Sequence, residues 1–123
     1  MSDFRKLVVW RKAHELAIRV HHVAGGIRGA RNASLRSQMV RAAMSIPTNI
    51  VEGSGQESRR ELARFLGYAA NSATELEYHL QIARDVEAIS LTDYASLTAR
   101  TVEVRKMLRG FTKRVREDTK RRE

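Results

Sequence analysis

A single proline inside a helical pattern constrains the fold of this chain more than any other feature. Pro47 is the only proline among 123 residues. A proline within a helix removes one backbone donor and clashes with the carbonyl four residues earlier, so the helix bends or breaks. Apolar residues continue at helical spacing on both sides, from Leu35 to Ile50. This favours a kinked helix over a stop, and Gly53 and Gly55 then end the helix.

Apolar spacing predicts three further helices. One stripe, with alternating steps of four and three residues, runs from Val9 to Ile27 and frays at the Gly25-Gly26 pair. Two more stripes run from Leu62 to Ala83 and from Tyr94 to Val115. No run of alternating apolar and polar residues indicates a strand, and loops this short force neighbouring helices antiparallel. The sequence therefore predicts an all-α, up-down-up-down antiparallel four-helix bundle.

Polar residues at the predicted helix starts indicate the caps. Ser58-Arg59-Arg60-Glu61 is a capping box, in which the hydroxyl and the carboxylate satisfy opposite free backbone donors. Asn32 or Ser34 is expected to cap the second helix, and Ser90 or Thr92 the fourth.

Charge is the strongest functional signal in the composition. Lys and Arg number 23 against 14 acids, a net charge of +9, which favours polyanionic partners, nucleic acid above all. The alternative is solvated helix ends, because cations also favour helix C-termini. The bundle domain is expected to span residues 1–115, followed by a basic C-terminal tail at 116–123. The candidate nucleic-acid contacts lie around the first loop and near the chain end: Arg28, Arg31, Arg36, Arg109, Lys113, Arg114 and Arg116.

No set of side chains meets the requirements of a catalytic or metal site. The chain has no cysteine, which excludes disulfides and thiolate zinc sites. Adjacent His21 and His22 point about 100° apart on a helix. Glu75 and His79 lack the Glu-x-x-His spacing of di-iron bundles. We therefore expect no catalytic residue, no metal site and no cofactor.

Two polar residues follow the proline. Glu52 is the best isolated carboxylate of the chain, but it has no catalytic partner in the sequence. We expect Asn49 and Glu52 to bond to backbone groups that Pro47 leaves free, which is a structural role.

Two tyrosines of the third helix lie outside its apolar stripe. At about 100° per residue, Tyr68 and Tyr78 lie roughly 120° or more from the centre of that stripe. Aromatic residues off the core face predict a second buried surface between subunits. The alternative is that each ring lies on the surface with its hydroxyl in water.

Three motifs follow one another along the chain. The opening motif is Leu7-x-Val9-Trp10-x-Lys12-Ala13. The central motif is Gln38-x-x-Arg41-Ala42-Ala43-x-Ser45-Ile46-Pro47-x-Asn49-Ile50-x-Glu52-Gly53-x-Gly55. The third-helix motif is Glu61-x3-Phe65-Leu66-x-Tyr68-Ala69-x2-Ser72-x2-Glu75-Leu76-Glu77. In this order, over residues 4–112, they resemble the small bacterial four-helix bundle proteins encoded in 23S rRNA intervening sequences. Gln56 departs from the pattern, which often has Arg there.

The resemblance implies an oligomeric state and a relationship that the residues alone do not predict. It implies a homopentameric ring with a central channel. It also implies relatedness to the accessory protein of diversity-generating retroelements, which binds a reverse transcriptase and nucleic acid. Most members have no assigned activity, so it implies no reaction, and it gives the Trp10 and Pro47 motifs a structural role.

Together these observations predict a non-enzymatic, cytoplasmic oligomer that binds RNA or DNA backbone, with RNA favoured and ribosomal RNA the natural candidate. A ring of basic chains multiplies the local field and adds avidity for phosphates. The alternative is a protein-interaction adaptor or scaffold for a nucleic-acid enzyme such as a reverse transcriptase. No stretch approaches the roughly 18 apolar residues of a membrane span, so no membrane partner is expected.

Overall fold

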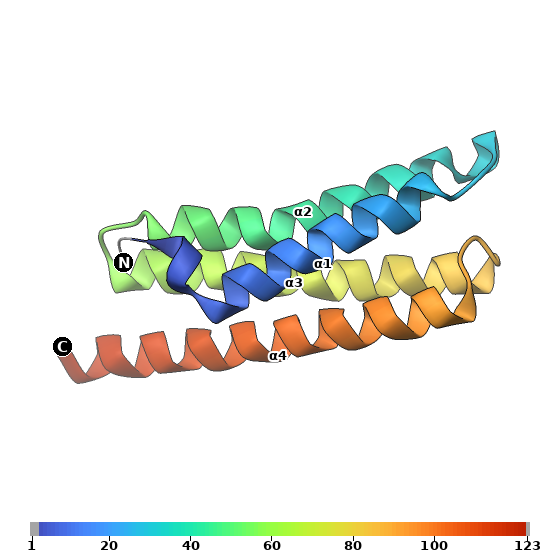
Figure 1. Ribbon diagram of the computed structural model, residues 1–123. Helices are drawn as coiled ribbons and strands as arrows, with labels where there is room; N and C mark the ends of the chain where they lie inside the picture. Colours follow the sequence, from blue (N-terminus) through green and yellow to red (C-terminus); the bar gives the residue numbers. More distant parts are fainter. Residues whose placement is uncertain (1–2, 123) are drawn as a thin grey trace.

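Four long antiparallel helices make up the computed structural model, which describes residues 3–122 (Figure 1). The helices are α1 (Val8–Gly25), α2 (Ala33–Ser54), α3 (Arg59–Asp85) and α4 (Leu91–Arg122). Single 3-10 turns precede α1 at Phe4–Lys6 and α2 at Ala30–Asn32. The described residues include no strand. The predicted all-α four-helix bundle is confirmed.

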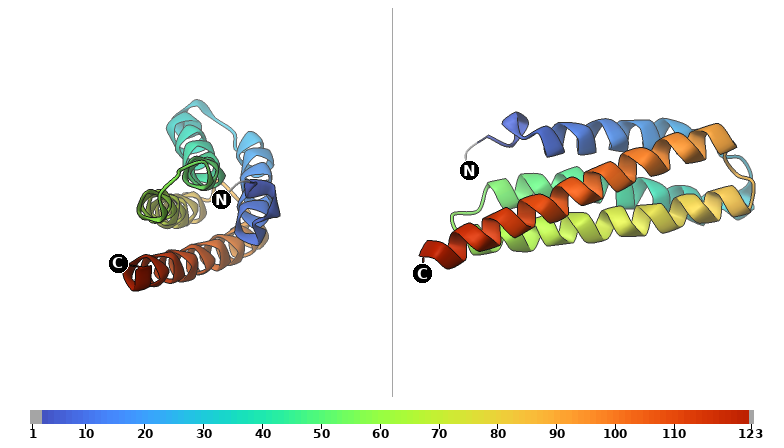
Figure 2. Two further views of the ribbon diagram at one scale, coloured as in Figure 1. Left: turned by 90° about the vertical axis from the view of Figure 1, so that its left-hand side faces the viewer. Right: turned by 90° about the horizontal axis from the view of Figure 1, so that it is seen from below.

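Each helix packs against two neighbours around the bundle. Helix α1 contacts α2 and α4, and α3 contacts the same two helices from the other side (Figure 2). The α1–α2 and α3–α4 loops lie at one end of the bundle (Figure 1). The α2–α3 loop lies at the other end, together with both described ends of the chain. The beginning of α3 therefore lies beside the last turns of α4.

The predicted apolar stripes form the core. Leu16 of α1, Leu66 and Leu76 of α3 and Leu108 of α4 are fully buried. Each buried leucine contributes about 1.5–3 kcal/mol relative to an exposed one. Alanines alternate with these leucines along α3 and are buried as well. Their small side chains let the helices approach closely.

Two of the predicted caps are present. Ser58 Oγ accepts a hydrogen bond from the backbone N–H of Glu61 at 3.0 Å, at the start of α3. Ser90 Oγ accepts one from the backbone N–H of Asp93 at 3.0 Å and thereby caps α4. Each such cap stabilises its helix by about 1 kcal/mol.

The prediction that Asn32 or Ser34 caps α2 is wrong. Asn32 occupies the N-cap position, but its side chain makes no capping bond. Its amide nitrogen instead donates to the carbonyl oxygen of Arg28 at 2.8 Å. The 3-10 turn before α2 brings that carbonyl close. Ser34 lies inside the first turn of α2 and cannot occupy the N-cap position.

Helix α2 is continuous through Pro47, and a bend there remains a prediction. Asn49 Nδ2 donates to the carbonyl oxygen of Ser45 at 2.8 Å and to its Oγ at 3.0 Å. It does not reach the carbonyl four residues before Pro47, because a side chain that folds back one turn meets its own i−4 carbonyl. The side chain of Glu52 is exposed. The expectation that these two residues satisfy the groups freed by Pro47 is therefore wrong.

The expected basic tail forms the last turns of α4. That helix has no break between residues 115 and 116, where the boundary was expected. Val115 is still buried. One turn later, Arg59 Nε on α3 donates to Asp118 Oδ2 at 3.0 Å. No glycine or proline interrupts this segment, so the helix runs on and stays attached to the bundle.

Candidate nucleic-acid interface

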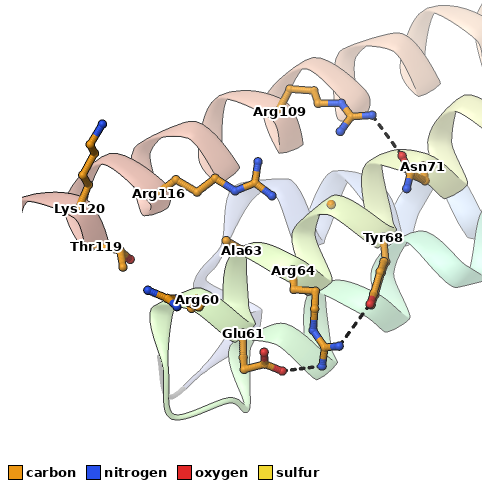
Figure 3. A pocket seen from close by; sticks show the side chains of 11 residues that line it. Arg60, Glu61, Ala63, Arg64, Tyr68, Asn71, Arg109, Arg116, Thr119 and Lys120 are labelled. Carbon is orange, nitrogen blue, oxygen red and sulfur yellow. Dashed lines mark hydrogen bonds and ion pairs between the residues drawn. The ribbon is translucent and has the colours of Figure 1, made fainter. Parts of the chain in front are cut away.

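The beginning of α3 and the end of α4 enclose an open hollow of about 700 Å³ (Figure 3). Steps of four and three residues place side chains of each helix on the face that borders it. Among the described residues, five cationic side chains and one carboxylate line it: Arg60, Arg64, Arg109, Arg116, Lys120 and Glu61. Both helices thus supply positive charge to one concave surface.

Small residues of α3 keep this hollow open. Ala63 and Gly67 lie on its floor. A Cβ atom added at Gly67 would have no heavy atom within 4 Å. The α2–α3 contact is closed by comparison, because a Cβ at Gly53 would lie 3.0 Å from Cβ of Phe65. At this end of the bundle, α3 therefore leaves space beside Gly67 on its α4 side, whereas it packs tightly against α2 at Gly53.

The α3 wall is a hydrogen-bonded row of side chains. Arg64 Nη2 donates to Glu61 Oε2, and its Nη1 donates to Tyr68 Oη at 3.4 Å. The hydrogen bond and the negative charge of Glu61 raise the pKa of Arg64 above its ordinary value. Phe65 packs edge-on against the Tyr68 ring with 5.6 Å between centroids. This wall holds a permanent cation and a fixed aromatic ring.

The α4 wall carries positive charge that is not neutralised. Arg109 Nη2 donates to the neutral Asn71 Oδ1 at 3.3 Å across the hollow, and Arg116 extends into the gap (Figure 3). Within residues 3–122, Arg116 and Lys120 form no ion pair. Of the acids in this part of α4, Asp118 pairs with Arg59, Arg121 and Arg122 instead. It lies about 180° round the helix from Arg109.

The structure divides the four residues predicted on α4. Arg109 and Arg116 line the hollow. Lys113 is exposed and lies about 40° from Arg109 around the helix, on the same face. Arg114 lies about 140° away. Its guanidinium carbon is 5.8 Å from the ring centroid of Phe111, in a different depression between α1 and α4.

The three arginines predicted around the first loop lie at the opposite end of the bundle (Figure 1). Arg36 Nη1 donates to the carbonyl oxygens of Ile27 at 3.1 Å and Gly29 at 3.0 Å. It therefore holds the loop in place. Arg28 and Arg31 are exposed. The structure does not bring this cluster together with the α4 residues.

Sequence reasoning missed most of the α3 wall. Arg60, Arg64 and Asn71 were not singled out, and Tyr68 was assigned to a subunit contact. Lys120 was left within a tail. The signal was present in the 4-3-4 spacing of Arg60, Arg64, Gly67 and Asn71, which begins inside the capping box. It became visible only when α4 supplied the opposite wall.

The arrangement suits anion binding. Guanidinium groups present planar forks that match phosphate oxygens. None of the described histidines lines the hollow. His14 instead stacks on Trp10 with 5.0 Å between ring centroids. No group of three potential metal ligands is found in residues 3–122.

A second, apolar depression lies between α1 and α2. Phe4, Trp10 and Pro47 contribute to its lining. At the same surface, Ile18 is 47% exposed and Met44 is 55% exposed. Large apolar side chains left in water at one place are typical of a contact surface.

Comparisons with known proteins agree on one family. The sequence profile of the 23S rRNA-intervening sequence protein family matches residues 5–110. A crystal structure of a protein with unknown function from the S23 ribosomal protein family, from Bacteroides thetaiotaomicron VPI-5482, is 28% identical. The match covers 86% of this chain and 99% of that one, with a TM-score of 0.81. Neither description refers to a reaction. No functionally curated protein shows significant similarity.

None of the helices within residues 3–122 combines the length and apolar character that crossing a bilayer requires.

Proposed function

This chain belongs to the 23S rRNA-intervening sequence protein family, and from that premise we propose that it binds RNA without catalysing a reaction. The phosphate backbone occupies the hollow between α3 and α4. The observation that carries this proposal is the convergence of cationic side chains from two helices on one open surface. If the positive charge served only solubility, the cations could lie anywhere on the surface and would not have to line the same hollow.

Electrostatics supports backbone binding. Arg116 and Lys120 pair with no acid among the described residues, so a ligand has no internal ion pair to displace there. Each phosphate that a cation neutralises releases counterions from the nucleic acid. The affinity should therefore fall steeply with salt, by a logarithmic slope of about 0.7 for each contact to a single strand.

Two considerations favour RNA over DNA. Arginine both forks onto phosphate and stacks on unpaired bases, which structured RNA exposes. The family description refers to an intervening sequence of 23S rRNA, which makes ribosomal RNA the first ligand to test.

We also propose that the protein acts as a homo-oligomer, with the pentamer of the sequence prediction as the specific expectation. The exposed Ile18 and Met44 beside the apolar depression support self-association. Light scattering gives the mass in solution. A mass of several 14.0 kDa chains supports the proposal, and a monomeric mass overturns this part of it.

The decisive experiment is a fluorescence anisotropy titration of labelled ribosomal RNA fragments at about 50 and 200 mM salt. The test variant is the double substitution Arg116→Glu and Lys120→Glu in the hollow. The matched control is Arg28→Glu with Arg31→Glu, which changes the net charge equally at the other end of the bundle. Circular dichroism verifies that both variants remain helical.

We expect the hollow variant to lose at least about tenfold in affinity and to flatten the salt slope by about 0.7 for each lost contact to a single strand. The control should stay within a few-fold of the unmodified protein. Equal losses in both variants would mean that net charge, and not the hollow, binds RNA. No RNA binding by the unmodified protein would overturn the proposal and leave the adaptor role as the alternative.

A further inference from the structure

The hollow between α3 and α4 holds more than phosphate-binding charge. Tyr68 and Asn71 border it beside the cations. An aromatic ring and an amide add little to phosphate neutralisation, but both recognise bases. Unpaired bases stack on aromatic side chains and present their edges to hydrogen-bonding groups.

The Tyr68 ring is both accessible and fixed. Tyr68 is 43% exposed. Phe65 supports its ring edge-on at 5.6 Å, and Arg64 Nη1 donates to its hydroxyl oxygen at 3.4 Å. A ring held from two sides loses little conformational entropy when a base stacks on it.

The amide of Asn71 is oriented by its neighbour. Arg109 Nη2 donates to Asn71 Oδ1 at 3.3 Å. This bond identifies the oxygen end of the amide, and Nδ2 donates to no group among residues 3–122, so its two hydrogens are available to an acceptor on a ligand. Uracil, guanine and cytosine all carry such oxygen acceptors.

Size and access decide between paired and unpaired RNA. A hollow of about 700 Å³ has the dimensions of a small-molecule site. A duplex keeps its bases stacked inside and presents phosphates, so it contacts the cations but not Tyr68. The missing side chain at Gly67 leaves the floor open beside the ring.

We infer that this hollow binds an unpaired nucleotide segment, with phosphates on Arg116 and Lys120 and a base against Tyr68. The inference rests on the proposed function and narrows its ligand from RNA in general to single-stranded regions. The cations supply affinity that is shared by all nucleic acids, and Tyr68 with Asn71 supplies the preference for exposed bases.

The test compares three labelled ligands of equal phosphate number: an unpaired RNA of about 12 nucleotides, an RNA duplex, and an abasic strand that keeps the phosphates and lacks the bases. The protein variants are Tyr68→Ala and Tyr68→Phe. The matched control is Tyr78→Ala, which removes another exposed tyrosine of α3, 62% exposed and outside the hollow.

Tyr68→Ala should weaken binding of the unpaired RNA by about tenfold and leave the duplex and the abasic strand unchanged. Tyr68→Phe and Tyr78→Ala should bind the unpaired RNA as the unmodified protein does. If all three ligands bind the unmodified protein equally and Tyr68→Ala changes none of them, the inference fails. The proposed function still stands in that case if Arg116→Glu with Lys120→Glu loses binding while the Arg28→Glu, Arg31→Glu control keeps it, and it fails if the hollow variant binds normally.

Discussion

Two basic clusters of this protein look alike in the sequence and differ in the structure. The cluster at the end of α4 faces a second helix with its own arginines across an open hollow. The cluster around the α1–α2 loop lies at the other end of the bundle, and its Arg36 donates to carbonyl oxygens of its own loop. The first cluster therefore has donors that can bind a ligand, whereas Arg36 of the second cluster uses its donors to hold the loop.

The difference shows that charge density alone does not define a binding surface. A binding surface needs cations that face one another across a common hollow, and it needs hydrogen-bond donors that the fold itself does not already use. Arg116 faces cations of a second helix and forms no ion pair among the described residues, whereas Arg36 already donates to two carbonyl oxygens. Three predictions test this contrast, in order of decreasing effect.

The largest effect is expected for Arg36→Ala. Hydrogen bonds from a charged donor contribute about 1.5–3 kcal/mol each when they are well shielded. Because this loop is partly exposed, we expect a loss of about 2 kcal/mol in the free energy of unfolding, measured by urea denaturation. RNA affinity, measured on folded protein, should stay within about twofold. Arg36→Lys, which keeps the charge but not the guanidinium, serves as the control. A large loss of affinity at unchanged stability would make the two clusters equivalent.

A smaller effect is expected for Gly67→Ala on the floor of the hollow. The added Cβ has no heavy atom within 4 Å, and alanine is favoured over glycine in a helix by about 1 kcal/mol. The free energy of unfolding should therefore rise by about that amount. Gly53→Ala, whose Cβ would lie 3.0 Å from Cβ of Phe65, should destabilise the protein. Denaturation of both variants measures the contrast. Destabilisation by Gly67→Ala would show that the hollow is closed.

The smallest effect separates two neighbours on α4. Lys113 shares the face of Arg109, whereas Arg114 lies against Phe111. Lys113→Ala should lower RNA affinity a few-fold and reduce the salt slope by about 0.7. Arg114→Ala should leave both unchanged. Anisotropy titrations at several salt concentrations provide the comparison. Equal effects of the two substitutions would mean that α4 acts through its total charge.

Much of the fold was predictable because it depends on local periodicity. The stripe from Leu62 to Ala83 is buried as expected. The Ser58 half of the capping box forms, whereas the Glu61 carboxylate accepts a hydrogen bond from Arg64. Asn32 was expected to accept a backbone hydrogen bond as a cap and donates one instead, and Asn49 donates to a carbonyl other than the expected one. The partners of an amide side chain depend on how the surrounding turns place the backbone groups. The division into a bundle at 1–115 and a basic tail at 116–123 rested on charge, which does not indicate where a helix ends, and α4 runs on to Arg122.

The sequence predicted the α4 side of the hollow but not the α3 side. Arg109 and Arg116 follow from the charge of the chain end, but their partners Arg60 and Arg64 lie about fifty residues away and carry no unusual local signal. Their importance arises from the antiparallel packing of α3 against α4. The spacing already places Arg114 about 140° from Arg109, but only the structure shows that it lies in the depression between α1 and α4.

The sequence by itself determined the four helices, the core and the excess of positive charge, because helical periodicity and composition are properties of short segments. The tertiary structure decided which cations share a surface, which ones hold the fold, and that Ala63 and Gly67 leave space between two helices. Convergence and space depend on residues that are remote in sequence, and only the packing of the helices brings those residues together.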